Sequence, residues 1–177
     1  VLRAPSQRQL NVHENVSFSL MQKCGIPVAK FGVATTPEEA YQIAKSLEEE
    51  LGCQDFVVKA QVLTGGRGKG TWKNGVKGGV KLVLTPEEVK GAASQMLNQT
   101  LVTKQTGEKG IVCNQVLICE RKYQRNEIFF CIMMEREFNG PVIVYSSFGG
   151  MNIEEVAVEH PSAIHKHTVS LDKGLPM

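Results

Sequence analysis

The sequence lacks the apolar stretches that secretion or membrane insertion requires. No apolar run approaches the ~18 residues of a membrane-spanning helix, and no secretory apolar core follows the amino terminus. Paired cysteines are also lacking, because the five cysteines are odd in number and include no Cys-x-x-Cys pair. We therefore expect reduced thiols, an intracellular compartment and no membrane partner.

A surplus of charge of one sign is also missing. The formal net charge is only +2 at pH 7, so the strong basic field of nucleic-acid-binding proteins is absent and nucleic acid is not an expected partner. The 177 residues are 42% hydrophobic, which is enough to bury a core in one domain or two small lobes.

Acidic residues are absent from residues 1–10, and the chain begins with Val1 rather than Met. Arg3, Ser6 and Arg8 give this segment the composition of an organellar transit-peptide remnant. A disordered amino-terminal arm is the alternative.

Helices and strands are predicted to alternate over residues 11–99. Thr36-Pro-Glu-Glu39 and Thr85-Pro-Glu-Glu88 are capping boxes with proline at the first helical position, and an apolar stripe follows each. A further helix is expected over 13–24. Strands are expected at 56–62 and 80–84.

The second half is predicted to be a β-rich lobe that begins near residue 100. Asn139-Gly140 is a strong hairpin signal, and Asn152 with Glu155 indicates a short capped helix. The strands expected in this lobe are 101–105, 112–121, 127–135, 141–146 and 164–171.

The stretch between residues 56 and 71 joins a strand to a glycine loop. Phe56, Val58, Ala60 and Val62 alternate with Val57, Lys59 and Gln61, so the first set is expected in the core and Lys59 in a cleft or solvent. Four glycines between Gly65 and Gly70 bring backbone amides close together beside Arg67 and Lys69. This arrangement predicts a polyphosphate site.

Two common nucleotide motifs do not fit this loop. Lys69 is followed by Gly70 where a P-loop needs a hydroxyl residue, and Thr71 stands where a dinucleotide fingerprint needs its third glycine. A glycine-rich hairpin with solvated charges is the alternative interpretation.

Further candidates lie in the second half. Glu120 and Glu127 end and begin successive expected strands and could bind an adenine amino group or ribose hydroxyls, or could be solvated. Tyr123 between them could pack on a base or on the sheet edge. His165 and His167 form too small a ligand set for us to assign a metal site.

Four blocks of sequence together resemble the β-subunit family of succinate–CoA ligase, also called succinyl-CoA synthetase. They are residues 57–70, 76–81, 101–106 and 149–157. The similarity runs from about Asn11 to the end and implies an α/β (α+β) ATP-grasp domain over residues 11–177. It further implies that this is the amino-terminal portion of the domain, so that the chain is a fragment with a truncated second lobe.

The resemblance also assigns nucleotide-binding residues. Lys59 is similar to the strand lysine that contacts the phosphates, and Gly66, Arg67 and Gly68 to the glycine loop that closes over them. Glu120, Tyr123 and Glu127 occupy nucleotide-contact positions of the family. Ala29, where the GTP-specific type has Gln, favours ATP. No metal ligand is assigned, since those of the family's Mg²⁺ are expected downstream.

The activity implied is that of the ADP-forming mitochondrial type, in the matrix and the tricarboxylic acid cycle. ATP, succinate and CoA give ADP, phosphate and succinyl-CoA through a phosphohistidine on a partner α subunit, so no catalytic residue is expected in this chain. Another ATP-grasp acid–CoA ligase, such as one using malate, or a truncated non-catalytic module is the alternative. The fragment alone is expected to be inactive, with apolar strand faces such as Phe129, Cys131 and Met133 uncovered.

Overall fold

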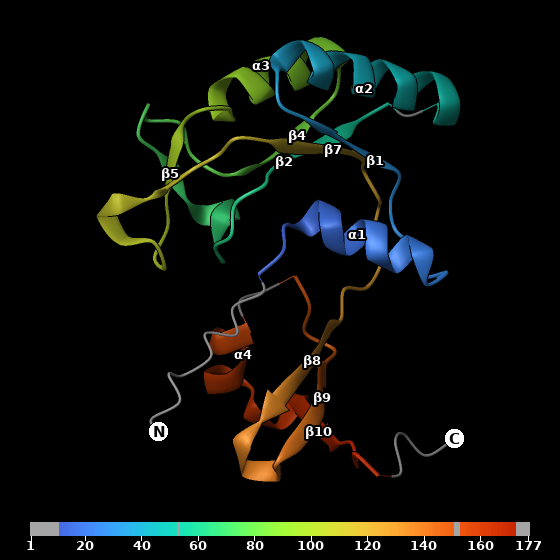
Figure 1. Ribbon diagram of the computed structural model, residues 1–177, viewed down its shortest axis with the longest axis vertical. Coiled ribbons are helices and arrows are strands. Elements are labelled where there is room, and N and C mark those ends of the chain that lie inside the picture. The colour runs from blue at the N-terminus through green and yellow to red at the C-terminus, as the bar shows by residue number, and fades with distance from the viewer. Residues whose placement is uncertain (1–10, 53, 151–152, 173–177) are drawn as a thin grey trace, which may run out of the picture. The chain divides into compact units, whose positions relative to one another are not determined.

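The computed structural model describes residues 11–52, 54–150 and 153–172 and divides into two compact units (Figure 1). The division falls between Lys122 and Tyr123. We expected the β-rich lobe to begin near residue 100. Instead, the strands between residues 100 and 120 pair within the first unit, so the boundary lies later in the chain. Residues 1–10, with the expected transit-peptide remnant or arm, lie outside the described residues.

The first unit is built on a four-stranded antiparallel sheet. Its strand order is β1 (Phe31–Ala34), β7 (Val116–Glu120), β2 (Phe56–Ala60) and β4 (Val80–Val83). Figure 1 shows α2 (Pro37–Leu51) and α3 (Pro86–Met96) on one face of this sheet and α1 (Glu14–Lys23) on the other. A second small sheet has the order β3 (Thr71–Trp72), β5 (Thr100–Val102), β6 (Ile111–Val112).

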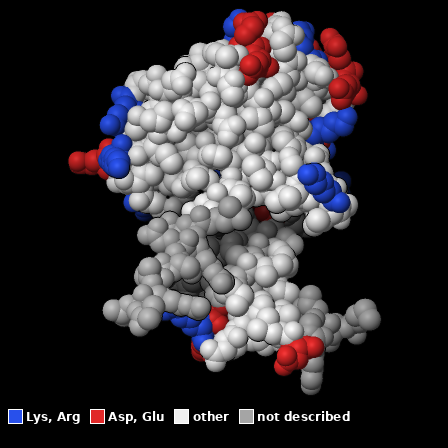
Figure 2. Space-filling view, viewed as in Figure 1, with Lys and Arg blue, Asp and Glu red and all other residues white. Residues whose placement is uncertain are grey.

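The capped helices form where the sequence predicted them. Thr36 and Thr85 each accept a hydrogen bond at the side chain from the backbone N–H three residues on, and α2 ends at Gly52 in the left-handed region. The carboxylates of Glu39 and Glu88 accept hydrogen bonds from the backbone N–H groups of Thr35 and Leu84, each of which is one residue before the cap. Figure 2 shows charged side chains gathered over the outer side of these two helices.

The main core lies between the sheet and the two capped helices. Phe56, Val58, Ala60 and Val62 are all buried there, as the alternation predicted. Val57 and Gln61 are buried as well, because the opposite face of the sheet is also covered. Val57, Leu117 and Cys119 form a second cluster to which Phe18 of α1 and Phe31 contribute.

The second unit contains a three-stranded antiparallel sheet in the order β10 (Ile164–Thr168), β9 (Gly140–Ser146), β8 (Phe129–Glu135). The predicted hairpin at Asn139-Gly140 is confirmed, with Asn139 at φ 49° after the 3-10 turn η3 (Arg136–Phe138). The helix α4 (Ile153–Glu159) and the turn η4 (Pro161–Ala163) precede β10. The expected Asn152 cap lies outside the described residues.

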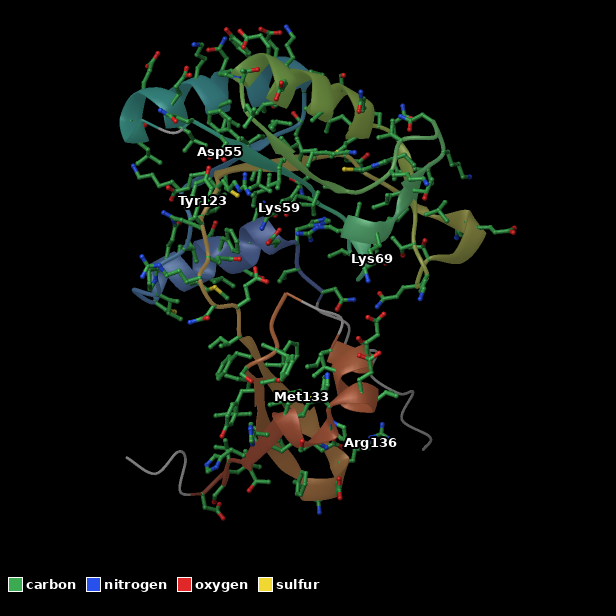
Figure 3. The ribbon with its side chains drawn as sticks, turned by 180° about the vertical axis from the view of Figure 1, so that it is seen from behind. Asp55, Lys59, Lys69, Tyr123, Met133 and Arg136 are labelled. Carbon is green, nitrogen blue, oxygen red and sulfur yellow. The ribbon has the colours of Figure 1, made fainter. Side chains whose placement is uncertain are left out.

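The two faces of this second sheet differ in exposure. Val142 and Val144 are buried on the face that they share with Phe129, Cys131 and Met133. The other face carries Phe130, Ile132 and Met134, which are 59%, 66% and 69% exposed. The expectation that Phe129, Cys131 and Met133 are uncovered was therefore mainly wrong, because Phe129 and Cys131 are half-buried and the exposed apolar face is the opposite one. Met133, labelled in Figure 3, is exposed as expected.

Some strands are shorter than expected because turns interrupt them. The strand expected at 101–105 ends at Val102, where the side chains of Thr103 and Thr106 bond to each other's backbone N–H groups. The strand expected at 112–121 is split into β6 and β7. Within the described residues, no helix is both long enough and apolar enough to span a bilayer.

Candidate functional site

The glycine loop folds into a tight turn directly after β2. Gly66 is left-handed, with φ 71°, and the 3-10 turn η1 (Arg67–Lys69) follows it. The carbonyl of Arg67 accepts hydrogen bonds from the N–H groups of Gly70 and Gly79. A Cβ at Gly79 would lie 2.9 Å from that carbonyl oxygen, so the loop requires a glycine on the neighbouring segment as well.

The side chains of Thr64, Thr103 and Gln105 tie the start of the loop to the segment after β5. The N–H of Gly65 donates to Gln105 Oε1 at 2.8 Å, and the hydroxyls of Thr64 and Thr103 are 3.1 Å apart. Sequence reasoning did not assign these residues. The only available signal was that all three belong to blocks that carry the family resemblance, Thr64 to residues 57–70 and the other two to residues 101–106.

Trp72 anchors the far end of the loop. Its indole is 1% exposed, and its Nε1–H donates to the carbonyl of Gly78 at 2.9 Å. The N–H of Gly78 in turn donates to the carbonyl of Gly70. Trp72 is therefore a buried anchor of the loop rather than an exposed aromatic side chain.

A carboxylate brings the two candidate phosphate-binding cations together. Lys59 points away from the main core, as predicted, but it meets α1 rather than open solvent (Figure 3). Its Nζ lies 3.1 Å from Glu14 Oε1, and Arg67 Nη2 donates to Glu14 Oε2. The Lys59 ammonium also lies 5.6 Å from the centre of the Phe18 ring.

The ion pairs set the ionisation of Glu14. Burial alone would raise the pKa of its carboxyl, but the charges of Arg67 and Lys59 and their hydrogen bonds together hold that pKa below its usual value. Glu14 is therefore ionised at neutral pH. The cluster of two cations and one carboxylate keeps one net positive charge.

A cleft of about 740 Å³ opens beside this cluster, within the first unit. Its walls come from α1 and from the segment after β2, and they include Glu14, Phe18, Gly65, Arg67 and Gln105. A cleft of this size is within the range of small-ligand sites. Lys69, the other loop cation, is exposed (Figure 3).

Glu120 lies at the end of β7 in the same unit. Its Oε1 accepts hydrogen bonds from the N–H of Lys30 at 2.9 Å and from Lys122 Nζ at 2.7 Å. Burial alone would raise the pKa of Glu120, but these bonds and the charges of the two lysines lower it. The carboxylate is therefore ionised and already has two donors.

Tyr123 and Glu127 belong to the second unit. Tyr123 is 75% exposed, and Glu127 is exposed with its backbone carbonyl accepting from the N–H of Gly149. The first unit thus brings together Lys59, Arg67 and the glycines of the loop, whereas Tyr123 and Glu127 are placed only within their own unit.

The remaining sequence candidates have ordinary surroundings. His165 stacks on Tyr145, with ring centres 5.0 Å apart, and among the described residues no three His, Cys, Asp or Glu side chains gather as metal ligands would. Cys119 is buried, and Cys131 is half-buried. Cys24, Cys113 and Cys131 are free thiols.

Comparisons with known proteins agree with one another. The family described as ATP-grasp domain matches residues 11–177. A mitochondrial ADP-forming succinate–CoA ligase β subunit of Columba livia is 55% identical over 168 residues, 95% of this chain and 40% of that protein. A hydrogenosomal β subunit of Neocallimastix frontalis is 49% identical over 175 residues, 99% of this chain and 39% of that protein. The chain thus spans about 40% of the length of these curated relatives.

A solved structure shares the fold at low sequence identity. It is a dinucleotide-forming acetyl-coenzyme A synthetase of Ca. Korarchaeum cryptofilum in complex with coenzyme A and Ca-AMPCP. The superposition gives a TM-score of 0.60 at 19% identity and covers 90% of this chain and 61% of that one. At this identity the likeness concerns the fold alone.

Proposed function

The chain belongs to the ATP-grasp family, and from this premise we propose that it is the nucleotide-binding part of an ADP-forming succinate–CoA ligase β subunit. ATP binding follows from the family. The whole enzyme would convert ATP, succinate and CoA to ADP, phosphate and succinyl-CoA. The observation that carries the proposal is the pairing of a strand lysine and a loop arginine beside a glycine turn that lines a cleft.

In this proposal the chain supplies phosphate binding. Phosphoryl transfer depends mainly on positioning and on neutralising the charge of the phosphates, which cations and backbone amides can do. Lys59 and Arg67 would carry the positive charge. Gly66 and Gly68 would let the loop backbone approach the phosphates because neither has a side chain in the way.

Glu120, Tyr123 and Glu127 would contact the adenosine part of ATP. A carboxylate accepts hydrogen bonds from an adenine amino group or from ribose hydroxyls, and a tyrosine ring can pack on a base. ATP is proposed rather than GTP because Ala29 stands where the GTP-specific type has Gln.

Mg²⁺ is also proposed, since it neutralises phosphate charge in such reactions. The described residues do not offer a metal site, because no three potential ligand side chains gather among them. We assign no step to the metal here and propose that its ligands lie in the part of the relatives that this chain does not span.

The proposed partner is an α subunit that carries the phosphorylated histidine, and the proposed compartment is the mitochondrial matrix. Relatives named as mitochondrial support this location, although the similar Neocallimastix protein is hydrogenosomal. His165 and His167 have no role in the phosphoryl transfer of this scheme.

The proposal is tested on the full-length subunit assembled with its partner. Calorimetry is expected to give ATP binding that is tighter than GTP binding, and product assays to give succinyl-CoA formation that depends on succinate. Malate in place of succinate is the control for the other acid–CoA ligases. Activity with malate but not succinate would overturn the acid assignment, and the absence of ATP binding would overturn the proposal as a whole.

A further inference from the structure

The carboxylate of Glu14 is the one side-chain group that contacts both candidate phosphate-binding cations among the described residues. Each of its oxygens binds one cation: Oε1 binds Lys59 at 3.1 Å and Oε2 binds Arg67. Lys59 comes from a strand and Arg67 from a loop, and their like charges repel each other. The carboxylate offsets this repulsion and fixes the two charged groups side by side.

The position of Glu14 is itself fixed by the sheet. The neighbouring N–H of Asn15 donates to Oε1 of Gln61 at 3.0 Å, and Gln61 is 2% exposed. One helical turn further on, Phe18 packs edge-to-face on Phe31 of β1, with ring centres 5.4 Å apart. A residue that positions others must be held in this way, because otherwise it would move with them.

The paired cations keep hydrogen-bonding capacity for a ligand. An ammonium has three N–H donors and a guanidinium five, and Glu14 accepts from one nitrogen of each. Nε of Arg67 is buried and has no partner among the described residues. A buried donor without an acceptor is destabilising, so this atom favours a ligand that supplies an oxygen.

We propose that Glu14 is a positioning residue of the phosphate site, which holds Lys59 and Arg67 where the polyphosphate of the nucleotide binds them. This inference rests on the proposed function of the same site. Glu14 does not touch the reacting atoms in this scheme but acts through the two cations. The opposite role is that of a competitor, in which the carboxylate occupies the phosphate position and ATP must displace it.

The two roles predict opposite effects of Glu14→Gln. A glutamine keeps the size of the side chain but has one acceptor oxygen and no charge, so it cannot hold both cations. If Glu14 positions the two cations, the substitution frees the guanidinium of Arg67 from its place beside Lys59, and ATP affinity falls. If Glu14 competes with phosphate, its neutralisation tightens ATP binding.

The experiment compares Glu14→Gln and Glu14→Asp with wild type in the full-length subunit assembled with its partner, using calorimetry with ATP and with adenosine. Glu48→Gln is the matched control, because it removes the same charge from an exposed 2.9 Å pair with Lys45 on α2. We expect Glu14→Gln to raise the Kd for ATP about tenfold and Glu14→Asp to raise it less. Adenosine affinity should not change, since adenosine has no phosphate, and the control should match wild type.

The proposal is overturned if Glu14→Gln binds ATP as well as or better than wild type, or if it loses adenosine and ATP affinity equally. The same loss in Glu48→Gln would also overturn it. Should the glutamine variant fail to fold, the aspartate variant decides, and an undiminished ATP affinity would count against the proposal. A wild-type enzyme that does not bind ATP would instead contradict the proposed function itself.

Discussion

At the residue scale, burial decides which ion pairs matter to the site. The side chains of Lys59, Arg67 and Glu14 are 21–23% exposed, whereas those of Lys30 and Glu50 are 56% and 54% exposed. Exposed pairs contribute ~0–1 kcal/mol because water and salt screen them, and removing one partner of a more buried pair costs more. We therefore expect the Glu14 cluster to affect both stability and ligand binding, and the surface pairs to affect neither strongly.

Lys59→Met is expected to weaken ATP binding by about 1.5–3 kcal/mol, the size of a lost hydrogen bond to a charged group, or roughly ten- to a hundredfold in Kd. A smaller loss of stability should accompany it, because Glu14 keeps Arg67 as a partner. Calorimetry on the full-length subunit measures the first effect and thermal unfolding the second. Lys45→Met, on the exposed face of α2, is the control. Unchanged affinity with a large loss of stability would mean that Lys59 is purely structural.

The depressed pKa of Glu14 predicts a pH-dependent stability. Its folded-state pKa lies below the unfolded value of about 4.3, so its ionised form stabilises the fold fully above that pH. The contribution is lost as the pH falls through the folded-state pKa. Glu14→Gln should thus be less stable than wild type at pH 7, by on the order of 1–3 kcal/mol.

This difference should shrink as the pH falls below about 4.3. Urea unfolding measures this difference in the free energy of unfolding of the first unit. The probe is the fluorescence of Trp72, which is buried there and is the single tryptophan of the chain. A difference that stays constant from pH 7 to pH 3 would show that the charge of Glu14 contributes nothing and that only its packing matters.

At the scale of the element, the glycine loop is bonded at its ends and at Arg67, while the side chain of Lys69 is exposed. Gln105 accepts from the N–H of Gly65 at the start of the loop. At the end, the N–H of Gly78 donates to Gly70, and the indole of Trp72 donates to Gly78. A segment of this kind opens locally at little cost, because few apolar contacts are lost when its tip separates from the sheet.

In limited digestion, trypsin is expected to cleave the bond after Lys69 faster than the bond after Arg67, because the guanidinium of Arg67 is bound by Glu14. ATP with Mg²⁺ should protect this site in the full-length subunit. Lys109 ends the similar 3-10 turn η2 (Gly107–Lys109) and does not line the cleft, so its rate of cleavage serves as the control. Equal cleavage at Lys69 with and without nucleotide would remove the loop from the binding site.

At the scale of the whole molecule, the two units differ in how well their sheets are covered. The central strands β2 and β7 of the first unit are buried on both faces, whereas the sheet of the second unit leaves Phe130, Ile132 and Met134 exposed. An apolar sheet face in water contributes little burial energy, and among the described residues β8 pairs with a strand on one side only.

Amide exchange on the 177-residue chain is expected to be slow in β2 and β7 and fast in β8, β9 and β10. The physical reason is the difference in burial, since exchange from core strands requires global unfolding and exchange from weakly packed strands does not. The same preparation should show no ligase activity. Slow exchange throughout residues 129–168 would show that the second unit is stable by itself and contradict this prediction.

The sequence by itself determined the elements whose signals are local. Thr36 and Thr85 stand three residues from the N–H groups that they cap, Asn139 adopts the left-handed conformation that its turn needs, and the alternation from Phe56 to Val62 marks the core face of β2. Each depends on neighbours within a few residues, so the pattern is visible in the chain. The polyphosphate site at the glycine loop stays a prediction, which the glycine and charge pattern and the family resemblance both make.

Only the tertiary structure decided what covers the other face of β2 and what meets its lysine. Glu14 is separated by 45 residues from Lys59 and by 53 from Arg67, and Gln105 by 40 from Gly65. No local spacing encodes such pairs, because they form only when α1 and the segment after β5 pack against the sheet. The packing places a carboxylate between two cations, which is why the lysine expected in a cleft or solvent is part of an ion-pair cluster.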